Sequence, residues 1–139
     1  SRDRLLTAVR CRGGGRNWID TSRSGDGGKT WTPDLPAAVP DTGEGNPASL
    51  VRLRDGRVCL TYGYRAEPFG IRARLSRDDG RTWGPEVALR SGGGGRDVGY
   101  PRSAQRPDGK VVTVYYFHDT PAGDRYIAAT IWDPGDGTK

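Results

Sequence analysis

Short apolar runs separated by turn residues recur along the chain. Between positions 70 and 75 apolar side chains alternate with arginines, which is typical of a strand that buries one face. The run at 58–64 follows an Asp-Gly pair, and Asp-Gly between two apolar runs indicates a β-hairpin. The pattern predicts strands over 48–53, 58–64 and 70–75, then a hairpin that leads into a fourth strand.

Two phrases occur twice at nearly the same spacing. Ser-x-Asp-x-Gly-x-Thr-Trp begins at Ser24 and again at Ser76, 52 residues later. An Asp-Gly pair followed by an apolar run begins at Asp55 and again at Asp108, 53 residues later, and the run at 4–9 fits the same phrase one period earlier. Five fixed positions matched twice are very unlikely to arise by chance, so the chain is built from repeated units.

Each period of about 53 residues holds four short strands, which is the make-up of one β-propeller blade. The 139 residues, divided by this period, supply about 2.6 blades. We therefore predict an all-β fold with a partial blade over 1–40, a complete blade of four antiparallel strands over 41–93 and a partial blade over 94–139.

Composition supports this fold class. Glycine and proline together account for 32 of the 139 residues, and aspartate outnumbers glutamate by 14 to 3. These residues favour turns, whereas glutamate and lysine, which favour helices, are scarce, so a helical bundle is excluded. No apolar run approaches the roughly 20 residues that a membrane-spanning helix needs, so we expect no membrane partner. The first four residues are polar or charged and do not resemble a signal peptide, which leaves the localisation open.

The two cysteines, Cys11 and Cys59, are too few for a disulfide scaffold. Neither has a histidine or a second cysteine at metal-ligand spacing. We therefore predict two small core residues and no metal site.

The formal net charge is +5, and 19 of the 22 basic residues are arginine. Arginine binds planar anions through paired hydrogen bonds, which points to a carboxylate, phosphate or sulfate ligand, or merely to solubility. The arginines are spread along the chain, whereas a nucleic-acid footprint more often clusters them, so we expect no nucleic-acid partner.

Polar residues at equivalent places in successive blades are candidates for a ligand site, because propellers bind ligands on their central axis. The offset of 53 aligns Arg12, Arg65 and His118 at the end of the second strand of each blade. A Gly-x-Pro phrase that recurs after 54 residues aligns Asn46 with Tyr100 near the first strand. Burial requires none of these side chains. The alternatives are that the arginines are solvated at strand ends and that Tyr100 packs near the axis.

The Ser-x-Asp-x-Gly-x-Thr-Trp phrase resembles the Asp box of the sialidase superfamily. The stretch at 97–101, followed by Asp108-Gly109, is similar to that family's last catalytic strand. The resemblance covers essentially the whole chain and implies a six-bladed β-propeller, of which this chain is similar to a C-terminal part. It implies that the Asp-box carboxylates hold peripheral turns, and we expect Trp31 and Trp83 to bury their rings between strands.

Sialidases hold the substrate carboxylate with three arginines and use a tyrosine nucleophile, which a glutamate activates, with an aspartate as acid/base. The resemblance matches Tyr100 to the nucleophile, because it stands about eight residues before the Asp-Gly turn. One family arginine matches Arg10, although the internal repeat favours Arg12 on the same strand face. The next matches Arg65, with Arg72 as a weaker candidate.

The candidate substrate-binding residues are Arg10, Arg12, Arg65, Asn46 and Asp97, the last being the first residue of the family phrase. The first family arginine, the aspartate and the glutamate would lie upstream of Ser1. The resemblance thus implies a segment of a sialidase-like glycoside hydrolase that acts on a carboxylated sugar without a cofactor and is inactive in isolation. The alternative is a non-catalytic carbohydrate-binding propeller. Open blade faces predict self-association or pairing with the missing blades.

Overall fold

The computed structural model describes residues 3–40, 42–44 and 47–135, and all regular structure within these ranges is β-strand. The strands are β1 (Leu5–Gly13), β2 (Arg16–Ser24), β3 (Thr32–Val39), β4 (Ser49–Arg52), β5 (Val58–Tyr64), β6 (Gly70–Ser76), β7 (Val87–Ser91), β8 (Gly99–Gln105), β9 (Val111–Phe117) and β10 (Tyr126–Trp132). The prediction of an all-β chain is confirmed, and the strand expected at 58–64 has those bounds. Nowhere in the described ranges is there a helix long and apolar enough to cross a membrane.

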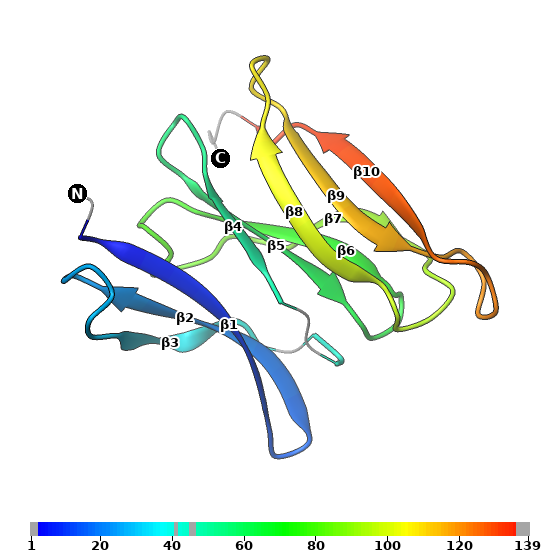
Figure 1. Ribbon diagram of the computed structural model, residues 1–139, viewed down its shortest axis with the longest axis horizontal. Helices are drawn as coiled ribbons and strands as arrows, with labels where there is room; N and C mark the ends of the chain where they lie inside the picture. The colour runs from blue at the N-terminus through cyan, green and yellow to red at the C-terminus, as the bar shows by residue number, and fades with distance from the viewer. Residues whose placement is uncertain (1–2, 41, 45–46, 136–139) are drawn as a thin grey trace.

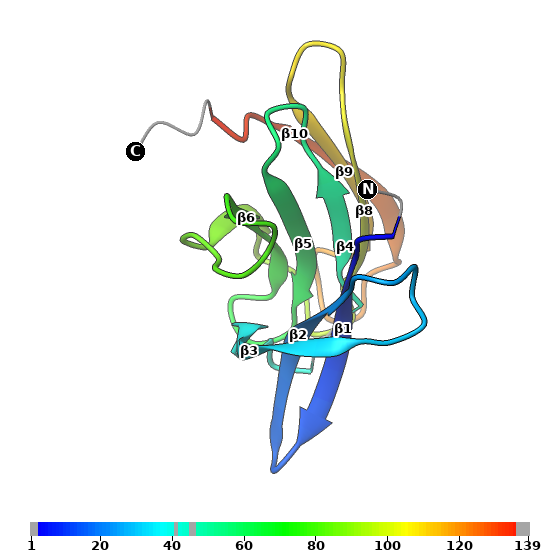
Figure 2. The ribbon, with the colours of Figure 1, turned by 90° about the vertical axis from the view of Figure 1, so that its left-hand side faces the viewer.

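The strands form three antiparallel meanders that follow one another along the chain (Figure 1). Their orders are β1-β2-β3, β4-β5-β6-β7 and β8-β9-β10. The two Asp boxes join β2 to β3 and β6 to β7, while the Asp-Gly turns join β4 to β5 and β8 to β9. The strands β1, β5 and β9 are therefore equivalent. Figure 2 shows the first sheet nearest the viewer, with the other two sheets behind it.

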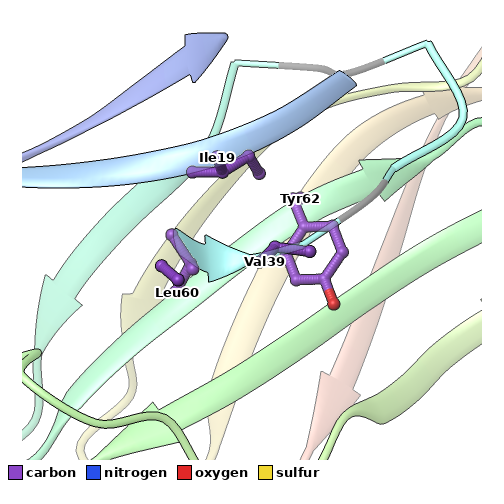
Figure 3. Close-up of a cluster of buried hydrophobic side chains, with 5 residues drawn as sticks. Ile19, Val39, Leu60 and Tyr62 are labelled. Carbon is purple, nitrogen blue, oxygen red and sulfur yellow. The ribbon is translucent and has the colours of Figure 1, made fainter. Parts of the chain in front are cut away.

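The core lies between neighbouring sheets. Ile19 and Val39 of the first sheet pack with Leu60 and Tyr62 of the second, and each of these side chains is at most 1% exposed (Figure 3). This burial removes apolar area from water on one face of each sheet, which fixes how the two sheets lie against each other.

Two further clusters join the second sheet to the third. One contains Ile71, Val98, Tyr115 and Phe117, and the other contains Leu53, Cys59 and Val111. Cys59 is thus a core residue, as predicted. The prediction for Cys11 is wrong, because its side chain is only half-buried and its thiol donates to Asp20 at 3.4 Å. The reason is that Cys11 lies on β1, an edge strand of the described first sheet.

Each Asp box is held by the same hydrogen bonds. In the second box the Thr82 amide and hydroxyl donate to the two Asp78 carboxylate oxygens at 2.8 and 2.6 Å, and the Gly80 amide donates to the Ser76 hydroxyl at 2.7 Å. The equivalent bonds in the first box measure 3.0, 2.7 and 2.8 Å. These carboxylates are committed to turns, which agrees with the implied structural role.

The expected burial of both Asp-box tryptophans is only partly observed. Trp83 is half-buried and packs on the cluster between the first and second sheets. Trp31 is 43% exposed, so that expectation is wrong. The equivalent face of the first sheet has no neighbouring sheet within the described residues, and a ring at that position needs one for burial.

Asp78→Asn tests the Asp-box turn. Partial burial raises the pKa of the Asp78 carboxyl, but the hydrogen bonds from Thr82 and Ser76 outweigh it and lower the pKa from 3.8 to about 2. The carboxylate therefore stabilises the fold above about pH 4, and this contribution is lost as the pH falls toward 2. We expect Asp78→Asn to lower the melting temperature at pH 7 and to flatten its fall between pH 4 and 2.

Thermal unfolding followed by circular dichroism measures both effects. Asp124→Asn, at an exposed loop position, is the matched control. An equal loss in that variant would contradict a specific role for the Asp box.

One face of the third sheet carries exposed apolar side chains. Val114 of β9 is 40% exposed, and Ile127 and Ile131 of β10 are 74% and 53% exposed. In the register between β9 and β10, Val114 pairs with Ala129 and Ile131 pairs with Val112. Ile127 and Ile131 each lie two residues from Ala129 on β10. The three exposed side chains therefore share one face. A contiguous exposed apolar face marks an interaction surface.

We propose that another copy of the chain, or further blades, cover this face. The chain alone should then associate at micromolar concentration, and Ile127→Lys should reduce the sedimentation coefficient toward that of a monomer. Leu35→Lys is the control, because Leu35 is 81% exposed on β3 and outside this face. A compact, stable monomer of the unchanged chain would contradict the proposal.

Candidate functional site

Loops from the second and third sheets meet at one end of the structure. Arg65 follows β5 directly, and its amide donates to the carbonyl of Thr42 in the loop before β4. Its guanidinium crosses to the third sheet, where Nε donates to the Val98 carbonyl at 3.2 Å and Nη2 donates to the Tyr116 hydroxyl at 2.9 Å. Arg96 forms an ion pair with Glu44, which joins the loops before β4 and β8. The packing of two sheets therefore places these loops together.

Tyr100 stands out from the core at this end. It is the second residue of β8, at a bulge where the register with β9 shifts between Gly99 and Arg102. Its φ is 49°, a left-handed conformation that is uncommon for a tyrosine, and such strained residues cluster at functional sites. The side chain is 48% exposed, and its ring centre lies 5.9 Å from that of Tyr116. The bulge thus presents the phenol to solvent.

A polar network lies beside this phenol. The Tyr116 hydroxyl donates to Asp97 Oδ1 at 2.7 Å, and Arg125 Nε donates to Asp97 Oδ2 at 2.9 Å. Burial and the bond to Asp97 raise the pKa of Tyr116 to about 12, although Arg65 opposes this rise. The hydrogen bond from Tyr116 and the Arg125 guanidinium lower the pKa of Asp97 against a partial desolvation. At neutral pH the network therefore holds a carboxylate, a neutral phenol and two guanidinium groups.

The structure brings together three of the sequence-predicted residues, Arg65, Asp97 and Tyr100. Arg10 and Arg12 belong to the first sheet, where they are exposed at alternate positions of β1. None of the hydrogen bonds given above for Arg65, Asp97 or Tyr116 involves either of them. The remaining candidate, Asn46, lies outside the described residues.

The weaker candidate Arg72 is not available to a ligand. Its guanidinium is buried, donates to the carbonyls of Arg90 and Pro68 at 2.6 and 2.9 Å, and pairs with Glu86 at 3.3 Å. These contacts hold β6 against β7. A buried guanidinium with this many partners is structural.

In the aligned column of Arg12, Arg65 and His118, the histidine does not share a site with Arg65. Arg65 reaches the third sheet, whereas His118 is buried and its Nδ1 bonds to the carbonyl of Thr120 in its own loop at 2.8 Å. The prediction that His118 belongs to a ligand site is therefore wrong. Burial turns its ring into the protein.

Sequence reasoning missed Tyr116 and Arg125. Tyr116 lies in the repeated apolar run, where the 53-residue offset places Gly63, and this change from glycine to tyrosine was the available signal. Arg125 lies in the loop between β9 and β10, which is longer than the loop between β5 and β6, so the repeat gives it no counterpart. Among the described residues no cluster of His, Cys, Asp and Glu is arranged to hold a metal ion.

A comparison with protein families identifies the chain. The family model for the BNR repeat-like domain matches residues 1–113. The chain belongs to the BNR repeat-like domain family. No curated protein matches it.

Solved structures of similar fold also match the chain. A protein of unknown function from Dyadobacter fermentans DSM 18053 is 39% identical, with a TM-score of 0.75 over 92% of this BNR repeat-like chain and 34% of its own. The endo-arabinase of Bacteroides thetaiotaomicron VPI-5482 is 16% identical, with a TM-score of 0.75 over 97% of this chain and 54% of its own. The sucrose-6-phosphate hydrolase of Lactobacillus gasseri is 14% identical, with a TM-score of 0.60 over 99% of this chain and 33% of its own.

The two enzymes show the fold alone at these identities. Together with the three meanders, they establish the BNR repeat-like chain as a segment of a β-propeller. The chain spans about a third of the length of the Dyadobacter protein.

Proposed function

We propose that this chain forms part of the ligand-binding face of a sialidase-like glycoside hydrolase that acts on a carboxylated sugar. The observation that carries the proposal is the exposed phenol of Tyr100 on a left-handed backbone, next to a network that contains Arg65, Asp97 and Arg125. Solvent exposure, a special backbone conformation and converging charged groups are features of ligand sites in β-propellers.

Tyr100 is the proposed nucleophile. Its phenol oxygen forms a bond to the anomeric carbon as the bond from that carbon to the leaving oxygen breaks. The leaving oxygen takes a proton from a carboxylic acid, and the phenol gives its proton to a carboxylate, both supplied by the rest of the propeller. Water then releases the sugar by attacking the same carbon with retention of configuration.

Arginines hold the sugar carboxylate in this proposal. Arg65 uses two of its five N–H donors in the bonds to Val98 and Tyr116, so further donors remain for a ligand. Either Arg10 or Arg12 supplies a second guanidinium from the first sheet. Asp97 and Asn46 accept or donate hydrogen bonds at the sugar hydroxyls.

The second candidate function is a non-catalytic carbohydrate-binding propeller. One observation favours it. Tyr100 and Tyr116 form an aromatic pair on which an apolar sugar face can pack.

In either function the proposed partner is a carbohydrate and not a nucleic acid or a membrane. Several arginines are already paired with aspartates, including Arg23 with Asp34 and Arg90 with Asp119. Such pairs leave fewer free cations for a phosphate backbone, whose binding depends on neutralised charge.

Tyr100→Phe in the complete propeller separates the two functions. With an activated sialoside, the hydrolase predicts a turnover number lower by orders of magnitude, because the nucleophilic oxygen is lost. The free energy of unfolding should change by less than about 1 kcal/mol, because the ring stays and its hydroxyl makes no hydrogen bond within the described ranges. Steady-state kinetics and thermal unfolding measure these two quantities.

Tyr126→Phe is the matched control. Tyr126 lies on β10 outside the proposed site, and its hydroxyl donates to Asp119 at 2.6 Å. It should leave turnover unchanged. Full activity of Tyr100→Phe would remove this residue from the mechanism. Sugar binding without turnover in the unchanged propeller would leave the binding function.

A further inference from the structure

Tyr116 occupies a fixed place beside the bulge that exposes Tyr100. It pairs across the ladder with Gly99, the residue before Tyr100, and its ring is tilted by 31° against the Tyr100 ring. Tyr115 before it and Phe117 after it are buried against the second sheet, so strand alternation directs Tyr116 to the opposite face. The buried neighbours therefore set where the Tyr116 hydroxyl lies.

That hydroxyl joins two loops that belong to different sheets. Its single O–H donates to Asp97 in the loop before β8, and its oxygen accepts the N–H of Arg65 in the loop after β5. A phenylalanine at this position would keep the ring contact and lose both bonds. No other side chain contacts both of these partners through one atom in the described hydrogen bonds.

The electrostatics agree with this geometry. The charged or titratable groups that act on Asp97 are Tyr116, Arg125 and Arg65, and the hydrogen bond from Tyr116 is the largest influence that lowers the Asp97 pKa. The Tyr116 phenol stays protonated at neutral pH, so it remains a donor. The bond to a carboxylate is charge-assisted and therefore stronger than a bond between neutral groups.

We infer that Tyr116 is a positioning residue of the ligand site: its hydroxyl sets the placement of the Arg65 guanidinium and the Asp97 carboxylate beside Tyr100. The inference rests on the proposed function. The Tyr116 hydroxyl already donates to Asp97 and accepts from Arg65. It acts by holding the group that binds the sugar carboxylate.

The first test measures Asp97 directly in the complete propeller. Carbon-13 NMR of the labelled carboxyl group gives its titration midpoint in Tyr116→Phe and in Tyr115→Phe. Tyr115 lies on the same strand, and its hydroxyl bonds to Thr130 at 2.6 Å on the other face, so Tyr115→Phe also removes a hydroxyl hydrogen bond but leaves the contacts of Asp97 in place. We expect the midpoint to rise toward 3.8 in Tyr116→Phe alone. A midpoint that does not move in Tyr116→Phe, or that moves equally in both variants, would overturn the inference.

The second test measures binding of free N-acetylneuraminic acid and of its carboxamide by calorimetry. If Tyr116 positions Arg65, Tyr116→Phe should weaken binding of the acid by about tenfold, the effect of one charge-assisted hydrogen bond, and should change binding of the amide much less. Tyr115→Phe should leave both affinities unchanged. Equal weakening of acid and amide by Tyr116→Phe would indicate a general loss of structure and would also overturn the inference.

The two proposals fail in different ways. If the unchanged propeller binds the sugar without turnover while Tyr116→Phe moves the Asp97 midpoint and weakens only the acid, the hydrolase is wrong and Tyr116 positions a binding site. If Tyr116→Phe alters neither quantity while Tyr100→Phe abolishes turnover, the hydrolase stands and the positioning role is wrong.

Discussion

The face-to-face packing of consecutive sheets is the constraint on which the rest of this structure depends. No sheet of three or four strands buries a core alone, and here the apolar clusters lie between one sheet and the next. Equivalent strands occupy the same place in each sheet, so the loops that follow them lie at one end of the structure. Packing of the sheets brings these loops together. The 53-residue repeat therefore sets the position of the candidate site as well as the fold.

The candidate site follows from this packing because its members come from two sheets. Arg65 belongs to the second sheet, whereas Asp97, Tyr100 and Tyr116 belong to the third. The buried residues Val98 and Phe117 anchor the loop and the strand that carry this group. Mutations that loosen the interface between these sheets should therefore affect the ligand site without touching it.

Sequence patterns predicted the features that depend only on residues close together in the chain. The strand at 58–64 and the Asp-box turns follow from alternation and turn chemistry within a few residues. Other features depend on which sheet or loop lies opposite: the exposure of Trp31, the burial of Arg72 and the hydrogen bonds of Tyr116. No pattern within one period contains that information. The repeat aligned Arg65 with His118 correctly in sequence, but the different loops that follow them send the two side chains in different directions.

The claim that Tyr100 is the nucleophile is tested most directly by trapping a covalent intermediate. A fluorinated, carboxylated glycosyl fluoride should react with the complete propeller and leave the sugar attached, because the fluorine slows its release. Peptide mass mapping should then find the added sugar on the peptide that contains Tyr100, at the phenol oxygen. A label on any other residue, or turnover of the natural substrate class with inversion at the anomeric carbon, would contradict the account.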